Sequence, residues 1–490
     1  MNLPDPTSTL GWLLLALEIV LRLVALGVIP GNRKPSTGMA WLLLILVEPI
    51  IGFIVFQLFG RTRLEGRRVA RQKRAIEAVL GPSEALHLEY DESAIPPELR
   101  TVAELNRRLG ALPMSGGNEV ELWPDYAGVI AEMAAEVDRA RSFVHVEFYI
   151  TAWDDVTDPL FQALVRATER GVVVRMLFDH LGSRRVDGYR GMLRRLRRTE
   201  IRWRPMLPIQ PLRGRFRRPD LRNHRKILVV DGSVGFTGSL NLTEPGYNSR
   251  KNHRLGREWV ELMVRLEGPV VGALNAVFAT DWYVETAEAV DLVPVHGAPD
   301  RRADEVFDVP CQVVPSGPGI VAENNLRMFT ALIYSATERI SLTSPYFVPD
   351  ESLLYAVTTA AQRGVAVELF VSEVSDQFMV GHAQASYYRA LLAAGVRIFR
   401  YPAPYVLHAK HFTVDDKVAV VGSSNMDMRS FGLNFEVSLM LPSPEVVAKL
   451  REVEDSYRTL SRELTREAWQ ERPARTRYVD NVMRLTAALQ

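Results

Sequence analysis

The stretch His224-Arg-Lys-Ile-Leu-Val-Val-Asp231-Gly-Ser-Val-Gly-Phe-Thr-Gly-Ser-Leu-Asn241 decides the fold of this chain. It occurs a second time as His408-Ala-Lys-His-Phe-Thr-Val-Asp415-Asp-Lys-Val-Ala-Val-Val-Gly-Ser-Ser-Asn425, with every interval between its His, Lys, Asp, Gly-Ser and Asn residues kept. A fixed pattern that occurs twice in one chain indicates a duplicated unit. We therefore expect one active site that is assembled from two similar halves.

The segments around the two motifs also correspond in order. A helix over 126–141 precedes a strand over 144–150, and a helix over 322–338 precedes a strand over 340–347. In each half there follow a helix, a glycine that can end it and a buried strand. This alternation predicts the α/β class, with two tandem α/β/α halves over residues 101–290 and 305–490. The segment 294–308, rich in proline and charge, is expected to connect them.

The motif itself alternates as a strand does. His224 and Lys226 are two residues apart, so on a strand they point to the same face, and the second copy repeats this. Asp231 and Asp415 have the opposite phase and fall in turns, which favours a structural role although they belong to the motif. The Gly-Ser pair after the next strand offers backbone N–H groups and a hydroxyl that suit an anion.

The first sixty residues differ from the rest of the chain. Residues 10–29 and 39–59 are apolar runs of the length that spans a bilayer. Glu18 and Arg22 lie four residues apart in the first run, where they can pair on a helix; a buried or interfacial helix is the alternative there. Arginines and lysines crowd residues 61–74, so the positive-inside rule puts the large C-terminal part in the cytoplasm.

These runs predict a multi-pass protein of the cell membrane. Residues 1–60 form a two-helix transmembrane anchor, and residues 61–100 form a basic juxtamembrane helix (about 64–80) and a linker. The formal net charge of the 490-residue chain is only +1, which argues against a nucleic-acid partner because such a partner needs a basic groove. The single cysteine, Cys311, excludes a disulfide framework and a cysteine zinc cluster.

The doubled H-x-K-x4-D-x6-G-S-x-N pattern resembles the phospholipase D superfamily. The two N-terminal apolar runs, together with LHAKHFTVDD and GSSNMDMRSFGLNFE, resemble its bacterial cardiolipin synthase branch. The resemblance covers nearly the whole chain. It implies two phospholipase D-like halves with the active site between them, and a chemistry that uses no metal or other cofactor.

The resemblance assigns roles to the motif residues. One imidazole attacks phosphorus and forms a phosphohistidine, the other protonates the departing alcohol, and the lysines neutralise the phosphodiester. Family analogy favours His224 as the nucleophile. The catalytic residues are then His224, Lys226, Asp231, His408, Lys410 and Asp415, and the residues that bind the substrate phosphate are Ser239, Asn241, Ser423 and Asn425.

A catalytic histidine needs a partner that fixes its tautomer, and the family places a carboxylate downstream of each motif. Glu436 is this carboxylate after the second motif, and Glu261 is favoured after the first, with Glu258 as a competitor. Many relatives have Trp-Arg-Asp where this chain has Trp259-Val-Glu, so the arginine is missing and the acid is one methylene longer.

Other polar residues are candidates for positions near the expected site. Strand ends converge on ligand crevices in α/β sheets, which makes Asp179, His180, Asp376 and His382 possible neighbours, whereas His253 and His411 are expected to be bystanders. A basic cluster flanks the first motif and is expected either to hold anionic headgroups or to be a solvated loop: Arg213, Arg215, Arg217, Arg218, Arg222 and Arg225.

The resemblance implies a membrane-embedded enzyme that transfers a phosphatidyl group between two phosphatidylglycerol molecules, releases glycerol and forms cardiolipin. Its partners are then phosphatidylglycerol and anionic membrane lipids, with a homo-oligomer left open. A phospholipase D-type hydrolase, or a transferase that uses phosphatidylethanolamine or another alcohol, is the alternative. A superfamily nuclease is a third reading, which the near-neutral charge and the apolar runs disfavour.

Overall fold

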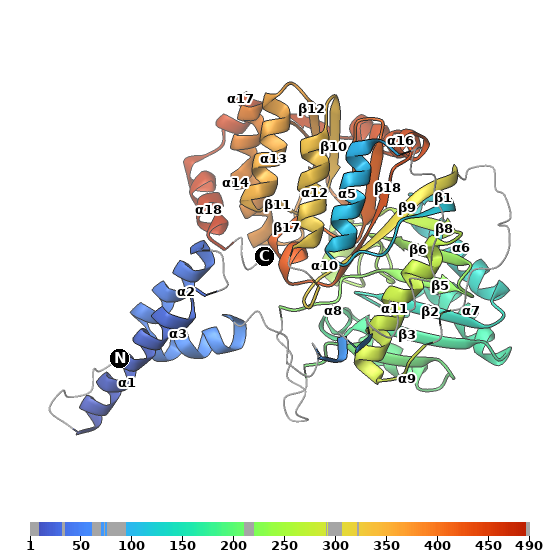
Figure 1. Cartoon of the computed structure of the whole chain (residues 1–490), viewed down its shortest axis with the longest axis horizontal. Coiled ribbons are helices and arrows are strands. Elements are labelled where there is room, and N and C mark those ends of the chain that lie inside the picture. The colour runs from blue at the N-terminus through green and yellow to red at the C-terminus, as the bar shows by residue number, and fades with distance from the viewer. Residues whose placement is uncertain are drawn as a thin grey trace. The chain divides into compact units, whose positions relative to one another are not determined.

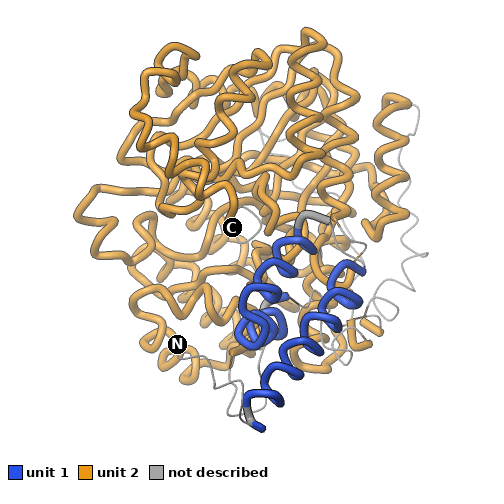
Figure 2. The backbone as a smooth tube through the Cα atoms, turned by 90° about the vertical axis from the view of Figure 1, so that its left-hand side faces the viewer, with its two compact units in different colours: residues 1–64 blue, residues 65–490 orange. Residues whose placement is uncertain are grey.

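The computed structural model describes residues 9–31, 35–60, 70–72, 74–75, 95–209, 220–290, 292, 306–320 and 323–486. The chain forms two compact units, residues 1–64 and 65–490 (Figure 2). Most of the expected juxtamembrane helix, most of the connector over 294–308 and the arginines between 213 and 218 lie outside the described residues.

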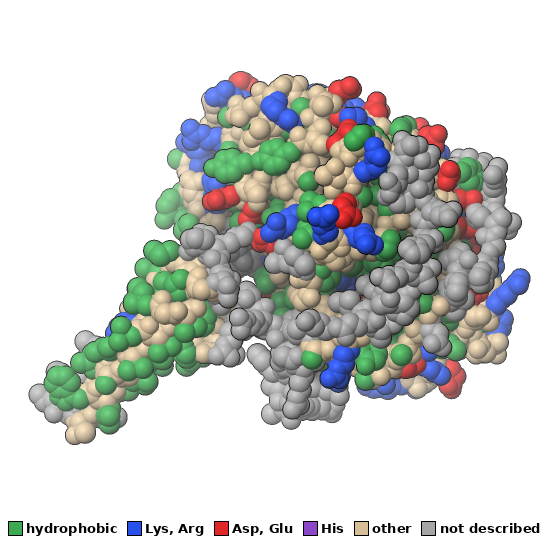
Figure 3. Space-filling view, in the orientation of Figure 1, with side chains coloured by type: hydrophobic (Ala, Val, Ile, Leu, Met, Phe, Trp, Pro, Cys, Tyr) green, Lys and Arg blue, Asp and Glu red, His purple; other side chains and the backbone are tan. Residues whose placement is uncertain are grey.

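The first unit contains one helix that is long and apolar enough to cross a membrane by itself. This helix, α1 (Thr9–Val28), has a mean hydropathy of 2.1 over Gly11–Val28. Its two charged residues pair as expected, with Arg22 Nη1 3.2 Å from Glu18 Oε2. Hydrophobic side chains cover most of the visible surface of this unit (Figure 3), as a membrane-embedded segment requires.

The second apolar run does not form one long helix. It consists of α2 (Pro35–Val47), α3 (Pro49–Val55) and a π-helical turn, η1 (Phe56–Gly60). Pro49 lacks an N–H and interrupts the helix after Glu48, so α2 has only 13 residues, about 20 Å, against the roughly 30 Å of a bilayer core. Of the described residues, only α1 meets the length of a span, and the expected pair of transmembrane helices is not confirmed.

One 15-stranded sheet runs through both halves of the second unit (Figure 1). The first half contributes β1 (Ser115–Trp123), β2 (Phe143–Phe148), β3 (Val173–Asp179), β4 (Arg202–Met206), β5 (Ile227–Val230), β6 (Val234–Gly238) and β8 (Met263–Glu267). The second half contributes β9 (Val306–Ser316), β10 (Arg339–Thr343), β12 (Ala366–Ser372), β13 (Arg397–Tyr401), β15 (His411–Val414), β16 (Val418–Gly422), β18 (Glu436–Leu441) and β19 (Arg462–Leu464).

The strand order confirms the duplication. From the central antiparallel pair of β1 and β9, the first half runs outward as β1-β8-β6-β5-β2-β3-β4, and the second as β9-β18-β16-β15-β10-β12-β13, with β19 added at the edge. The hairpins β5–β6 and β15–β16, which follow the two His-x-Lys sequences, therefore occupy equivalent positions. Two small parallel sheets, β7 (Trp259–Val260) with β14 (Val406–Leu407) and β11 (Phe347–Val348) with β17 (Met426–Asp427), lie outside the large one.

Helices cover both faces of the large sheet, because its strands alternate apolar side chains to either side. On one face, α11 (Val270–Thr286) and α16 (Pro444–Leu460) share a single core that joins the two halves. The other face carries α6 (Tyr126–Arg139), α7 (Asp158–Glu169) and α9 (Tyr189–Leu196) in the first half, and α12 (Asn324–Ser335), α13 (Glu351–Gln362) and α14 (Phe378–Ala394) in the second. Shorter or peripheral helices are α8 (His180–Arg184), α10 (Arg250–Leu255), α15 (Met428–Gly432), α17 (Arg466–Gln470) and α18 (Ala474–Arg484).

The helix α5 (Pro97–Arg108) packs on the second half although it precedes the strands of the first. It overlaps the start of the expected first half, yet Leu99 and Val102 lie in the core of the second half with Phe329 of α12. Asn106 Nδ2 also donates to Gln312 Oε1 of β9 at 2.9 Å. In Figure 1, α5 stands beside α12 accordingly, so the strands of the first half begin only at β1.

The motif strands begin later than expected. β5 starts at Ile227 and β15 at His411, so each motif His and Lys precedes its ladder. The reason lies in the backbone of the first motif: the His224 N–H donates to the carbonyl oxygen of Phe435, in the other half, at 2.8 Å. The motif histidine of the first half therefore lies where the chain contacts the other half.

Candidate active site

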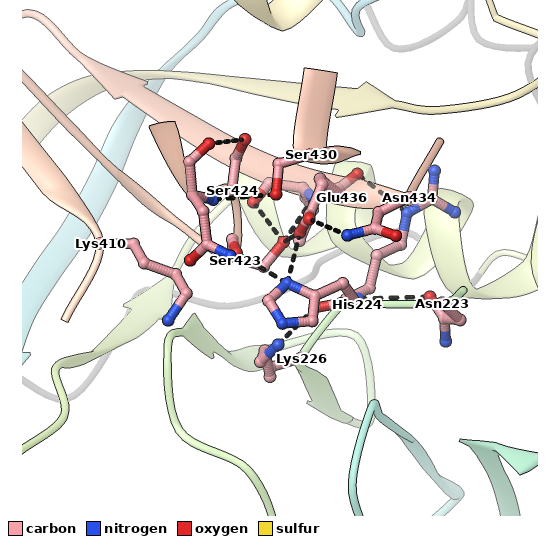
Figure 4. Close-up of polar contacts among 12 residues, drawn as sticks. Asn223, His224, Lys226, Lys410, Ser423, Ser424, Ser430, Asn434 and Glu436 are labelled. Carbon is pink, nitrogen blue, oxygen red and sulfur yellow. Dashed lines mark hydrogen bonds and ion pairs between the residues drawn. The ribbon is translucent and has the colours of Figure 1, made fainter. Parts of the chain in front are cut away.

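Each motif histidine is held by a glutamate of the other half. His224 Nδ1 lies 3.0 Å from Glu436 Oε2 and 3.0 Å from the carbonyl oxygen of Ser423 (Figure 4). His408 Nδ1 lies 2.7 Å and 2.9 Å from the two carboxylate oxygens of Glu261. Glu261 was expected to partner the motif that it follows in the chain, but the contacts cross between the halves.

Equivalent backbone hydrogen bonds position both His–Glu pairs between the halves. The His224 N–H donates to the carbonyl of Phe435, the residue before Glu436. The His408 N–H donates at 2.7 Å to the carbonyl of Val260, the residue before Glu261, and the β7–β14 pair reinforces this contact. In both cases the histidine backbone bonds to the residue that precedes the glutamate, and this brings the imidazole Nδ1 next to the carboxylate. The two backbone contacts therefore position both His–Glu pairs.

Two buried lysines complete the cluster. Lys226 Nζ donates to the His224 carbonyl oxygen and Lys410 Nζ to the His408 carbonyl oxygen, each at 2.6 Å, and Lys410 Nζ also lies 3.1 Å from His408 Nε2. The Lys410 side chain extends toward the region of the His224 ring in Figure 4. Burial and the charge of Lys410 lower the pKa of Lys226 to about 7, and burial lowers the pKa of Lys410 to about 8.

The histidines are neutral in the resting site. Burial lowers the pKa of both His224 and His408 to about 4, against the opposing effect of their glutamates. Burial raises the pKa of Glu261 and Glu436, but the paired histidines and the lysines outweigh it, so both carboxyls have a pKa below the usual value. At neutral pH each Nδ1–H therefore donates to an ionised carboxylate, which leaves Nε2 with the lone pair of a nucleophile or base.

The two serines that were expected to bind phosphate instead fix the glutamates. Ser423 Oγ donates to Glu436 Oε2 at 2.5 Å and accepts from the Val437 N–H at 3.0 Å. Ser239 Oγ accepts from the Leu262 N–H at 2.9 Å, and its hydrogen bonding lowers the pKa of Glu261 beside it. Both serines are fully buried, and the predicted contact of their hydroxyls with phosphate stays a prediction.

The glycine before each serine permits a close backbone crossing. A Cβ at Gly238 would lie 2.4 Å from the carbonyl oxygen of Leu262, and a Cβ at Gly422 would lie 2.3 Å from that of Val437. No side chain fits at these distances, which explains why the motif has glycine at this position in both copies.

The asparagines of the motifs have different environments. Asn241 Nδ2 donates to Tyr247 Oη at 2.7 Å, and Tyr247 Oη donates to Glu261 Oε1 at 3.3 Å. Asn425 Oδ1 is buried and has no hydrogen-bond partner within the described residues. Sequence reasoning missed Tyr247, because it lies in the Pro-Gly-Tyr-Asn turn after the motif, where neither strand periodicity nor the motif points to it.

Aromatic rings flank both histidines. The ring centroid of Tyr149 lies 4.8 Å from that of His224, and the centroid of Tyr346 lies 6.5 Å from that of His408. The Tyr346 hydroxyl donates to Asp376 at 2.9 Å, so this carboxylate reaches the site through a tyrosine. These rings exclude water around the imidazoles and contribute to their depressed pKa values.

Of the other expected neighbours, Asp179 lies directly beside a motif, Asp376 reaches the site through Tyr346, and His180 Nδ1 accepts from the Ile209 N–H at 3.4 Å. Asp179 accepts from the Asn223 N–H at 3.0 Å, directly before His224. The remaining histidines have partners away from the motif histidines: His382 with Asp480, His253 with Glu244, and His411 with Glu454.

The motif aspartates hold loops and do not face the histidines. Asp231 accepts from the backbone N–H groups of Arg141, Ser142 and Phe143, at 2.7–2.8 Å. Asp415 receives bonds from the backbone of residues 337–339 and from the hydroxyl of Thr337. Each aspartate follows its strand, about 16 Å along the chain from the motif lysine. These bonds give both aspartates the structural role that their strand phase favours.

Two arginines of the expected headgroup cluster are also structural. Arg222 pairs with Asp179 at 3.1 Å, and Arg225 pairs with Asp281 and donates to the carbonyl oxygen of Glu436 at 3.0 Å. Both guanidinium groups are almost fully buried. They therefore cannot bind a headgroup at a surface, and they fix the loop that carries His224 instead.

Comparison with known families matches residues 133–282 and 329–456 to the family described as "Cardiolipin synthase, PLD-like domain". The two matched segments contain one His-x-Lys motif each, and together they cover more than half of the chain. The chain belongs to this cardiolipin synthase family. The resemblance stated from the sequence is thereby confirmed.

Individual relatives of the cardiolipin synthase family agree. The chain is 32% identical over 475 residues to "Cardiolipin synthase A" of Wigglesworthia glossinidia brevipalpis, covering 96% of this chain and 94% of the relative. It is 33% identical over 478 residues to the protein of that name from Yersinia pseudotuberculosis serotype O:1b (strain IP 31758), covering 95% and 94%. The crystal structure of phosphatidylserine synthase from Haemophilus influenzae Rd KW20 has the same fold, with a TM-score of 0.59 at 14% identity over 80% of this chain and 100% of that one. This membership makes the chain a phospholipase D-type phosphatidyltransferase.

Proposed function

We propose that this enzyme transfers a phosphatidyl group from one phosphatidylglycerol to the hydroxyl of another, forming cardiolipin and releasing glycerol through a phosphohistidine. The observation that carries the proposal is the crossed pair of His–Glu contacts with two buried lysines beside them. An in-line exchange at one phosphodiester requires a neutral imidazole as nucleophile, a second imidazole that can gain and lose a proton, and cations that bind the phosphate.

The lysines bind the phosphodiester. Their pKa values of about 7 and 8 mean that the empty site carries only part of their charge at neutral pH. A bound anion favours the protonated form of each amine and raises both values, so the site becomes fully cationic when substrate arrives. This charge opposes the negative charge on the non-bridging oxygens in the transition state.

In the first step His224 Nε2 attacks phosphorus. The new N–P bond forms as the P–O bond to glycerol breaks, and His408 gives its Nε2 proton to the departing oxygen. His408 has a pKa of about 4 in the empty site, so it holds this proton only when the phosphodiester supplies negative charge nearby. Its carboxylate partner, Glu261, stabilises the imidazolium from the other side.

In the second step the roles of His408 reverse. The neutral imidazole takes the proton of the hydroxyl of a second phosphatidylglycerol, whose oxygen attacks phosphorus while the N–P bond breaks. His224 leaves as a neutral base that Glu436 still holds. Dividing the exchange into two steps lets a lipid alcohol take the place of water as acceptor.

Apolar side chains near the site support a lipid substrate. Gln377 Nε2 donates to the hydroxyl of Tyr346 at 3.0 Å, and the ring of this tyrosine lies next to His408. Phe378 and Met379 follow Gln377 directly and begin α14. Their side chains are exposed, Phe378 to 66% and Met379 to 43%. Exposed apolar residues beside a catalytic centre are suited to contact with acyl chains.

A product assay tests the proposed reaction. Purified enzyme in mixed micelles receives phosphatidylglycerol that carries one isotope in its terminal glycerol and another in its acyl chains. We expect cardiolipin and free glycerol in equal amounts. Phosphatidic acid without cardiolipin would instead indicate a hydrolase and would contradict the proposal.

We further propose that both apolar runs anchor the chain, with the catalytic unit on the cytoplasmic side. The native cysteine, Cys311, is buried, so introduced cysteines can be labelled selectively. In intact cells we expect an impermeant maleimide to label Gly31→Cys, between the runs, but not Asn2→Cys. Labelling at Asn2 from outside would contradict two spans.

A further inference from the structure

A cavity in the first half lies apart from the residues described above. It has a volume of about 740 Å³, within the range of small-molecule sites, and its lining residues come from α8, α9, β4 and the turn between the two helices. None of the motif residues lines it. Four arginines do: Arg184, Arg190, Arg197 and Arg204, with a single carboxylate, Asp187.

The arginines are available to a ligand. No ion pair joins Arg184, Arg190 or Arg197 to a carboxylate among the described residues, whereas neighbouring arginines of the same half have such partners, such as Arg195 with Asp158. All four arginines are exposed, so solvent screens their mutual repulsion, and an anion that enters the cavity meets an excess of positive charge. Guanidinium forks match the oxygens of phosphate better than any other side chain does.

A buried histidine at the cavity provides a further donor. His180 lines the cavity and is only 6% exposed. Its Nδ1 accepts the Ile209 N–H at 3.4 Å, so in the neutral ring the proton resides on Nε2. This Nε2–H has no partner within the described residues and is free to donate to an anion.

The walls of the cavity are rigid. The rings of Tyr189 and Trp203 both line it, and both pack on Phe178 of the core, at centroid distances of 6.4 Å and 6.0 Å. The backbone of Gly188 and Gly191 is unobstructed, because a Cβ at either position would meet no atom within 4 Å. The aromatic part of the wall is therefore fixed by the core, and the glycine side is open to a ligand.

We propose that this cavity binds a phosphate or phosphate ester, as a second anion site beside the catalytic one. The source of the group is either an anionic phospholipid headgroup or free phosphate, and both present the same oxygens to the arginines. Binding here does not depend on turnover, so it can be measured separately from the proposed reaction.

The test uses the full-length protein in micelles of an uncharged detergent and equilibrium dialysis with radiolabelled inorganic phosphate. We expect Arg184→Gln/Arg197→Gln to lose one bound equivalent, or to bind it at least about ten-fold more weakly. The matched control is Arg194→Gln/Arg198→Gln, which removes the same charge from adjacent positions that do not line the cavity. It should bind as the wild type does.

A second variant and two further probes complete the test. Arg190→Gln alone should also weaken binding, which guards against misfolding of the double variant. Deacylated phosphatidylglycerol and, in a His224→Ala background that cannot consume it, intact phosphatidylglycerol identify the source: preference for the intact lipid assigns a headgroup, and equal binding of all three assigns a free anion. Unchanged stoichiometry and affinity in both cavity variants would overturn the proposal.

Discussion

His408 Nδ1 lies 2.7 Å from Oε1 of Glu261, a residue of the other half of the chain, and His224 is joined in the same way to Glu436. Neither half therefore contains a complete histidine–carboxylate pair. Each half contributes one histidine and the glutamate that binds the histidine of the other half. Both pairs therefore form only when the two halves are packed together.

Glutamine at the two glutamate positions should separate their roles. Because Glu436 orients the nucleophile, Glu436→Gln should slow turnover by about 10²- to 10⁴-fold with any donor. Glu261→Gln should slow the first step only with phosphatidylglycerol, since a donor with a p-nitrophenol leaving group needs no acid in that step. Pre-steady-state rates of leaving-group release with both donors check this, because the second step needs His408 as a base with either donor. Equal slowing of the first step in Glu261→Gln with both donors would contradict the crossed assignment.

The lysines should set the alkaline limit of activity. A lysine is charged below its pKa, so kcat/KM should fall as pH rises through about 7 to 8, where Lys226 and Lys410 lose their protons in the free enzyme. On the acid side, kcat/KM should fall as pH drops through about 4, where the nucleophilic imidazole becomes protonated. Lys226→Arg keeps its charge and should move the alkaline limb upward; an unmoved limb would exclude Lys226 as its cause.

Removing a buried lysine should stabilise the fold while it destroys activity. The pKa of Lys226 is lower in the folded state than in the unfolded chain, so below pH 7 the folded protein keeps a desolvated charge beside Lys410. At pH 6 we expect Lys226→Met to raise Tm by about 1–3 °C. Calorimetry measures the change, and Leu228→Met serves as a control for side-chain volume. A lower Tm would show that the hydrogen bond to His224 outweighs the relief of charge.

Asp415 and His408 should behave in opposite ways. Asp415 accepts bonds from the backbone of residues 337–339, so Asp415→Ala should lower the free energy of unfolding by about 2–3 kcal/mol. The folded fraction should retain kcat within about three-fold, as expected for a group away from the reacting atoms. His408→Ala should keep its Tm and lose turnover with phosphatidylglycerol. Loss of kcat in a fully folded Asp415→Ala would restore a catalytic role to this aspartate.

The sequence predicted the parts of the site that depend on local pattern. The doubled motif and its alternation were sufficient to predict two α/β halves and the two hairpins, although each motif His and Lys lies just before its strand and not in it. The local pattern does not predict why glycine precedes Ser239 and Ser423. The reason is the close approach of a neighbouring strand, which is seen only in the folded structure.

Features set by tertiary contacts were not predictable. The crossed glutamates depend on strand connections between residues about 150 to 210 positions apart, such as Val260 with His408. The packing of α5 on the second half depends on a core that forms only in the folded chain. In the second apolar run, the mean hydropathy is high despite Pro49, so hydropathy alone predicts one long helix. Pro49 nevertheless interrupts the helix, because it lacks a backbone N–H.

The most direct test of the central claim uses a phosphatidyl donor with a p-nitrophenol leaving group and the His408→Ala variant. This donor needs no acid, and the variant cannot activate an acceptor, so the reaction should stop after the first step. We predict a burst of one p-nitrophenol per enzyme and a phosphatidyl adduct on His224 by mass spectrometry of the quenched protein, with neither in His224→Ala. A burst in His224→Ala, or no adduct on His224, would contradict the account.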